Sequence, residues 1–132
     1  MRCIFVHPFR ATVSKDVTTT LQEVFRTDKG AVYQCDTSNR LVLEFWDTHT
    51  YLSARDFAQF RRMVQTVDLR QMALSTAAAD DVEILTLPRS ERCYVLTLCE
   101  VVHLRELLAG ARLMLELNSM LRECGCSMTN YV

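Results

Sequence analysis

Apolar and polar side chains alternate with a period of two through much of residues 24–52, which is the pattern of β-strands. Residues 28–30 mark a first turn, where we expect Gly30 to supply a positive φ, and residues 36–39 mark a second turn. After the second turn, one strand face is expected to carry Leu41, Leu43 and Phe45, and the other face Val42, Glu44 and Trp46. A third turn at Asp47 leads to a short final strand. The whole stretch predicts an antiparallel meander.

A helical period replaces this alternation after Leu52. Ser53 and Asp56 have the spacing of a capping box, in which the hydroxyl accepts a hydrogen bond from an amide and the acid reaches back to the cap. The apolar side chains that follow fall on one face of a helix, namely Phe57, Phe60, Val64 and Val67. This pattern predicts an amphipathic helix whose tail continues into a linker in residues 70–81, where apolar side chains other than alanine are few.

The second half of the chain repeats the same order of elements. Residues 82–87 and 93–96 have the pattern of two strands around a polar turn, and Thr97 with Glu100 forms a second capping box. This box opens a helix that we expect to run to about Glu123, close to Gly125. The two strand-to-helix joints, YLSARDFAQF and VLTLCEVVHL, share one pattern, and an arginine follows each of them. Either duplication or repeated use of good capping chemistry explains this likeness.

These elements predict an α+β fold, in which an antiparallel meander and a second hairpin carry two capped amphipathic helices on one face. A length of 132 residues corresponds to one domain, with strand-then-helix halves at about 1–70 and 81–132. The hydrophobic content of 49% and the charged content of 23% are those of a globular protein, so global disorder is not expected.

The second predicted helix is apolar around most of its circumference, so it must be buried on more than one side. One apolar side is expected to face the sheet. A further stripe, which the sheet cannot reach, comprises Val102, Ala109, Leu113, Leu117 and Met120. So small a domain rarely has a centre that can enclose a helix, and we therefore expect a twofold homodimer that covers this stripe. The alternative is a central core helix that the first helix clamps.

The net charge of −1 gives no strongly basic field of the kind that non-specific nucleic-acid binding needs. Tyr33, Trp46 and Tyr51 would stack single-stranded bases if they shared a sheet surface with arginines, but we favour the interpretation that they are ordinary core and strand side chains. No apolar run approaches the roughly eighteen residues of a membrane span, and the N-terminus has no secretory signal pattern. The sequence therefore predicts a cytoplasmic protein whose six cysteines are reduced.

Cys99 and His103 stand four residues apart on the second predicted helix and would form half of a metal site. Cys124 and Cys126 offer two more sulfurs, but about 37 Å of continuous helix separates Cys99 from Cys124. One ion would join both pairs only if the helix broke at Gly110 or a second copy lay antiparallel. We therefore interpret the cysteines as small packing residues and predict no metal or cofactor. No nucleotide-binding or zinc-protease motif occurs, so an enzyme is not favoured.

Residues 30–64 resemble a family of small uncharacterised bacterial proteins. The shared features are a glycine before a strand, a cysteine, and a strand leading through Leu-Ser into a helix that opens with Phe-x-x-Phe. The pattern also includes a strand that ends in Phe-Gly-Asn. The matching residues here are Gly30, Cys35, Phe45, Leu52, Ser53, Phe57 and Phe60. The chain departs from this pattern at Ser38, where a second cysteine would stand, and at Trp46 and Asp47, which replace Gly-Asn. The first departure counts against a zinc knuckle, and the resemblance implies no activity.

Three functions follow from these patterns. The leading hypothesis is a non-enzymatic interaction or scaffold module that works as a homodimer and binds a protein partner that the sequence does not name. The second is a single-stranded nucleic-acid-binding protein that uses the sheet aromatics. The third is a thiol- or metal-dependent protein that uses Cys99 and His103.

Overall fold

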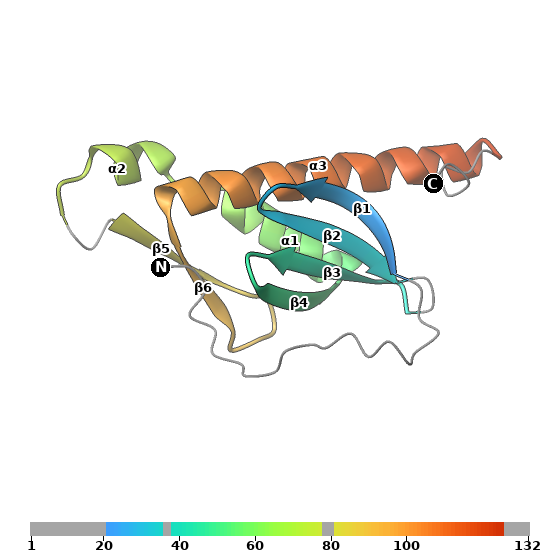
Figure 1. Cartoon of the computed structure of the whole chain (residues 1–132), viewed down its shortest axis with the longest axis horizontal. Coiled ribbons are helices and arrows are strands. Elements are labelled where there is room, and N and C mark those ends of the chain that lie inside the picture. The colour runs from blue at the N-terminus through green and yellow to red at the C-terminus, as the bar shows by residue number, and fades with distance from the viewer. Residues whose placement is uncertain (1–20, 36–37, 78–80, 126–132) are drawn as a thin grey trace.

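The structure, a computed structural model, describes residues 21–35, 38–77 and 81–125. Its elements in chain order are β1 (Leu21–Thr27), β2 (Gly30–Cys35), β3 (Arg40–Phe45), β4 (Thr48–Ser53), α1 (Ala54–Gln65), α2 (Leu69–Leu74), β5 (Val82–Thr86), β6 (Cys93–Thr97) and α3 (Leu98–Glu123). The first four strands form an antiparallel meander in the order β1-β2-β3-β4, and β5 pairs with β6 in a separate hairpin. The predicted α+β fold is confirmed (Figure 1).

Helices α1 and α3 divide the meander between them. Helix α3 contacts β1 and β2, and α1 contacts β3 and β4. Helix α3 also contacts α1, α2 and both strands of the hairpin, so it touches almost every other part of the fold. Figure 1 shows α3 running along the whole molecule and continuing beyond the strands at its C-terminal end.

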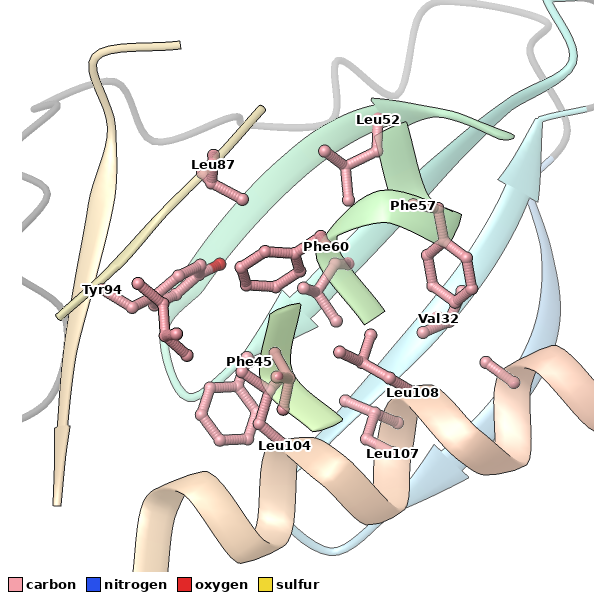
Figure 2. Close-up of a cluster of buried hydrophobic side chains, with 14 of the residues drawn as sticks. Val32, Phe45, Leu52, Phe57, Phe60, Leu87, Tyr94, Leu104, Leu107 and Leu108 are labelled. Atoms are coloured by element: carbon pink, nitrogen blue, oxygen red, sulfur yellow. The ribbon is translucent and has the colours of Figure 1, made fainter. Parts of the chain in front are cut away.

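The hydrophobic core lies where the meander, α1, α3 and the hairpin meet (Figure 2). Val32 and Phe45 reach it from the meander, Phe60 from α1, and Leu104 and Leu108 from α3, and all five are fully buried. Burying each such side chain stabilises the fold by about 1.5–3 kcal/mol. The core therefore ties α3 to the rest of the chain through the first half of the helix.

Both predicted capping boxes lie at strand-to-helix joints, but only the second is complete. The Thr97 amide donates to Glu100 Oε1 over 2.9 Å, and the Glu100 amide donates to Thr97 Oγ1 over 3.4 Å. At the start of α1, the Asp56 amide donates to Ser53 Oγ over 3.1 Å. Aspartate is one methylene shorter than glutamate, and the Asp56 carboxylate lies 3.8 Å from Arg89 Nε instead of reaching back to the cap. The return half of the first box was predicted wrongly.

The first turn of the meander does not use the backbone freedom of Gly30. Thr27 pairs with Gly30 across a two-residue turn, and Gly30 does not have the positive φ that the sequence predicted. A Cβ at this position would instead lie 2.2 Å from the carbonyl oxygen of Glu44 on β3. Gly30 is required because β2 and β3 approach closely there, and that contact cannot be seen without the strand register.

Trp46 departs from the face that strand alternation assigned to it. It lies in the turn between β3 and β4 with a φ of 56°, so the extended backbone on which the alternation depends ends at Phe45. The indole packs edge-on against Phe45, with ring centroids 5.9 Å apart, and Lys29 Nζ lies 5.2 Å from the indole centroid. Trp46 is thus partly buried against the core, and its predicted place on the opposite face was wrong.

Residues 69–74 form a short helix, α2, in a stretch predicted to be a helix tail and linker. Asp68 caps α2 by accepting a hydrogen bond from the Gln71 amide over 2.9 Å, and Met72 is buried. Leu69 and Met72 pack on the core, but two such residues in so short a helix are too few to show a helical period, and α2 was therefore missed.

The arginine that follows the second repeated joint holds the end of the first helix. Arg105 donates from α3 to the carbonyl oxygens of Val64, Gln65 and Val67 over 3.1, 3.2 and 2.9 Å. These carbonyls belong to the C-terminal turn of α1 and the residues after it, where helical acceptors have no partner within the helix. A single side chain therefore fastens α1 to α3.

Candidate functional site: the outer surface of helix α3

The core-facing side of α3 is confined to its first half. The buried side chains of the helix are Glu100, Val101, Leu104, Leu107, Leu108 and Ala111. Ala111 is the last of them, although the helix, described over its full length, continues to Glu123. The remaining twelve residues extend about 18 Å at 1.5 Å per residue. Met114 and Leu115 still touch the core in part, and Leu117, Asn118 and Leu121 are half-buried. The end of the helix continues beyond the strands (Figure 1).

The side of α3 opposite the core carries a stripe of apolar residues, here called the outer stripe: Val102, Ala109, Leu113 and Met120. Their spacing of seven, four and seven residues keeps them within about 40° of one another on a helix with about 100° per residue. The stripe therefore runs straight along the helix for about 27 Å. Leu113 is 64% exposed and Met120 is 55% exposed. A solvent-facing helix side normally carries charged or polar residues at such positions.

The five residues predicted from the sequence as a dimer interface all lie on or beside this surface. Ala109, Leu113 and Met120 are exposed, and Val102 is half-buried within the stripe. Leu117 is half-buried at its edge, about 60° from the centre of the stripe. Their role in a dimer stays a prediction, because one chain shows only which side chains are open to a partner.

Charged side chains border the outer stripe on the side next to α1. Arg112 and Glu116 form an ion pair of 3.0 Å, with both side chains about half exposed. Burial lowers the pKa of Arg61, on α1, and the neighbouring guanidinium groups of Arg112 and Arg62 lower it further, while Glu116 opposes this effect. An apolar strip with a charged border has the composition of a protein-contact surface, since apolar residues supply burial and charges supply orientation.

The predicted half metal site is present on α3 but gains no further ligand. Cys99 is exposed and His103 is half-buried. No group of three or more histidine, cysteine, aspartate or glutamate side chains within the described residues is placed to hold a metal ion. The helix runs unbroken through Gly110, so Cys124 remains at its far end, and Cys126 lies outside the described residues.

Gly110 lies within continuous helix, and its missing side chain makes room for an aromatic ring. A Cβ at this position would lie 2.3–2.7 Å from three atoms of the Phe25 ring, which reaches α3 from β1. The glycine is thus a packing site for the meander, and it does not break the helix.

The outer surface of the meander carries two of the three aromatics predicted for base stacking. Tyr33 and Tyr51 lie on either side of Val42, because both pair with it across neighbouring strands. Trp46 does not join them, since it packs against Phe45 in the turn.

A chain of polar contacts that the sequence did not reveal crosses the same sheet surface. Glu23 accepts from Arg26 over 2.7 Å, and Arg26 also donates to the Tyr33 hydroxyl. The Tyr33 hydroxyl lies 3.5 Å from Glu44 Oε1, and His49 Nε2 lies 3.0 Å from Glu44 Oε2. Burial raises the pKa of Tyr33, and the Glu44 carboxylate raises it further, while Arg26 acts in the opposite direction.

This network links all four strands, but its chemistry does not suit a nucleic-acid surface. Two carboxylates, Glu23 and Glu44, lie among the tyrosines and would repel a phosphate backbone. The signal for the network was available only in part, since Glu44 and His49 become neighbours once Trp46 and Asp47 are recognised as a two-residue turn.

In comparisons with known proteins, no family model, no curated protein and no solved structure matches this chain. The resemblance of residues 30–64 to a bacterial family therefore stays a prediction. Among the described residues, no helix combines the length and the apolar character that a membrane crossing needs.

Proposed function

We propose that this protein is a non-enzymatic interaction module that works as a homodimer through the outer stripe of α3. The observation that carries the proposal is the position of Leu113 and Met120, which are large, apolar and more than half exposed directly opposite the core-facing side. Exposed apolar residues scattered singly need no explanation, but here they form a line along one element. A second copy of the chain offers the same line and covers both at once.

The second half of α3 supports the same proposal, because a helix needs tertiary packing to be stable. Most of the stability of a helix in a protein comes from tertiary packing of its apolar face. The twelve residues after Ala111 include no fully buried side chain, and the described part of the chain leaves Leu113 and Met120 without tertiary packing. A helix from a second copy would provide the missing contacts along Leu113 and Met120.

The other two functions have weaker support. A nucleic-acid surface would use Tyr33 and Tyr51, but the carboxylates beside them oppose phosphate. A metal or thiol function would use Cys99 and His103, which have no third ligand within the described residues. Neither group of residues forms a surface as extended as the outer stripe.

The proposal is tested by the mass of the protein in solution. We expect light scattering at micromolar concentration to give twice the chain mass of 15.2 kDa for the unmodified protein. Leu113→Glu should reduce that mass to the monomer value because it places a charge in the middle of the interface. Arg122→Glu is the control, since it places a glutamate at an exposed position on the side of α3 opposite the stripe. A monomer mass for the unmodified protein contradicts the proposal, as does an equal loss of dimer in the control.

A further inference from the structure

The border of the outer stripe carries a symmetric pattern of charge. Arg105, Arg112, Glu116 and Glu123 fall within about 40° of one another around α3, and are here called the charged flank. In chain order their signs are positive, positive, negative and negative. Met114 is the midpoint of this series, since Arg112 and Glu116 each stand two residues from it, and Arg105 and Glu123 each stand nine.

The opposite flank of the stripe has no such pattern. Its residues are Cys99, Glu106, Gly110 and Leu117, of which one is charged. Two helices that pair in parallel around a twofold axis bring one flank of each against the other flank of its partner. Two helices that pair antiparallel bring each flank against the same flank of the partner helix, with the order of its residues reversed. Only the antiparallel arrangement brings the charged flank against a flank of complementary charge.

We propose that the homodimer pairs its two α3 helices antiparallel through their outer stripes. The twofold axis crosses the helix pair at the level of Met114 along α3. This inference rests on the proposed function, because it specifies how the second copy is oriented. In this register Arg112 lies opposite Glu116 of the second copy, and the symmetry produces that contact twice. Arg105 lies opposite Glu123 of the second copy at the two ends, beside the α1 carbonyls to which Arg105 already donates.

The same axis also matches the apolar residues by size. Ala109 stands five residues before Met114 and Met120 stands six after it, so a methionine of one copy lies over an alanine of the other. Leu113 is next to the axis and meets Leu113 of the second copy. A large residue against a small one lets two helices pack at the usual axis separation of about 8–10 Å. The apolar residues are therefore compatible, to within one or two residues, with the register that the charges select.

Charge exchange between copies tests the orientation. Arg112→Glu places a glutamate opposite Glu116 of the second copy, and Glu116→Arg places an arginine opposite Arg112 of the second copy. Each variant should therefore repel its own copy. We expect the dimer dissociation constant of each variant to rise by roughly tenfold or more. In an equimolar mixture the two variants attract each other, and the mixed dimer should form within about threefold of the original affinity.

The mixture separates contacts between copies from contacts within one chain. The ion pair between Arg112 and Glu116 within one chain is absent from both variants, so its loss cannot be what the mixture repairs. If the mixture associates no better than either variant alone, the charged flanks do not meet and the antiparallel register is wrong.

Cross-linking gives a second readout that does not depend on charge. The background chain carries serine in place of the exposed Cys99 and Cys124, and of Cys3 and Cys126. With a short bifunctional maleimide, Ala109→Cys mixed with Met120→Cys should give cross-linked dimers, and neither variant alone should do so. Self-cross-linking of each variant would indicate parallel helices, which overturns this inference and leaves the homodimer standing. A monomeric unmodified protein would overturn the proposed function itself.

Discussion

The side-chain oxygens of Thr50 and Tyr94 lie 2.7 Å apart, and both residues are almost fully buried. Thr50 belongs to β4 of the meander and Tyr94 to β6 of the hairpin, so this hydrogen bond joins two sheets that share no strand pairing. The Tyr94 ring also packs against Phe45 and Phe60, with centroids 6.4 and 5.9 Å away. The bond therefore fixes how the hairpin meets the core (Figure 2).

Removing either hydroxyl should destabilise the fold. We expect Tyr94→Phe and Thr50→Val each to lower the free energy of unfolding by about 1–2 kcal/mol, because each leaves a buried polar group without this partner. The double variant should cost about 1 kcal/mol less than the sum of the two, since it removes both polar groups together. Chemical denaturation of the four proteins measures this cycle. Strict additivity would show that the two hydroxyls do not interact.

Gly110→Ala should destabilise the protein, although alanine normally favours a helix over glycine by about 1 kcal/mol. The added Cβ would overlap the Phe25 ring, and overpacking of this kind costs about 1–3 kcal/mol. In a Phe25→Ala background the ring is gone, and Gly110→Ala should then stabilise the fold. Thermal unfolding of the two pairs of proteins gives the sign in each background. The same sign in both would mean that Phe25 does not require the glycine.

The strands, the two long helices and their caps were predictable because each depends on nearby residues. The residues after Thr97 show both the capping pattern and the helical period, and the structure has the helix where they placed it. Trp46 failed because alternation assumes an extended backbone, and nothing in the local sequence announced its positive φ. The alternation of apolar and polar residues does not by itself show where the extended backbone of a strand ends.

Other features were missed because they depend on partners distant in the sequence. The sequence showed Arg105 only as the residue that follows the second strand-to-helix joint. The carbonyl groups that it binds lie 38 to 41 residues earlier. Gly110 was considered as a helix break, and its actual neighbour is a ring on β1. The outer stripe of α3 was found because all of its members lie on one helix, where periodicity is sufficient.

Arg105→Gln should loosen the junction between α1 and α3. The variant loses a charged donor to three carbonyl groups, and hydrogen bonds to charged groups contribute about 1.5–3 kcal/mol. We therefore expect the free energy of unfolding to fall by about 2 kcal/mol. Arg62→Gln is the matched control, because Arg62 is an exposed arginine in the last turn of α1 and should change stability by less than about 0.5 kcal/mol. Equal effects would show that the three contacts add nothing beyond surface charge.

The two helix caps should differ in strength. Ser53→Ala removes one hydrogen bond at the start of α1 and should cost about 1 kcal/mol. Thr97→Ala should cost somewhat more, up to about 2 kcal/mol, because Thr97 and Glu100 satisfy two amides reciprocally and Glu100 is buried. Urea denaturation of both variants compares the two caps. A larger cost at Ser53 would mean that the incomplete box is the stronger one.

The Tyr33 hydroxyl should ionise at a higher pH than an ordinary tyrosine. Burial raises its pKa above the usual 10.0, and Glu44 adds to the effect because a second negative charge beside a carboxylate is unfavourable. The folded state thus favours the protonated phenol. Its contribution to stability should be complete below pH 10 and should be lost as the pH rises through the higher folded pKa.

Ultraviolet absorbance during alkaline titration follows this ionisation, and the difference between the unmodified protein and Tyr33→Phe isolates the signal of Tyr33 from the other tyrosines. Glu44→Gln removes the neighbouring charge while keeping the shape of the side chain, so the Tyr33 pKa should move down towards its usual value. Glu91→Gln, an exposed position in the turn between β5 and β6, is the control and should leave the Tyr33 pKa unchanged. If Glu44→Gln left the titration where it was, the carboxylate would not act on the phenol, and the polar network across the sheet would end at Tyr33.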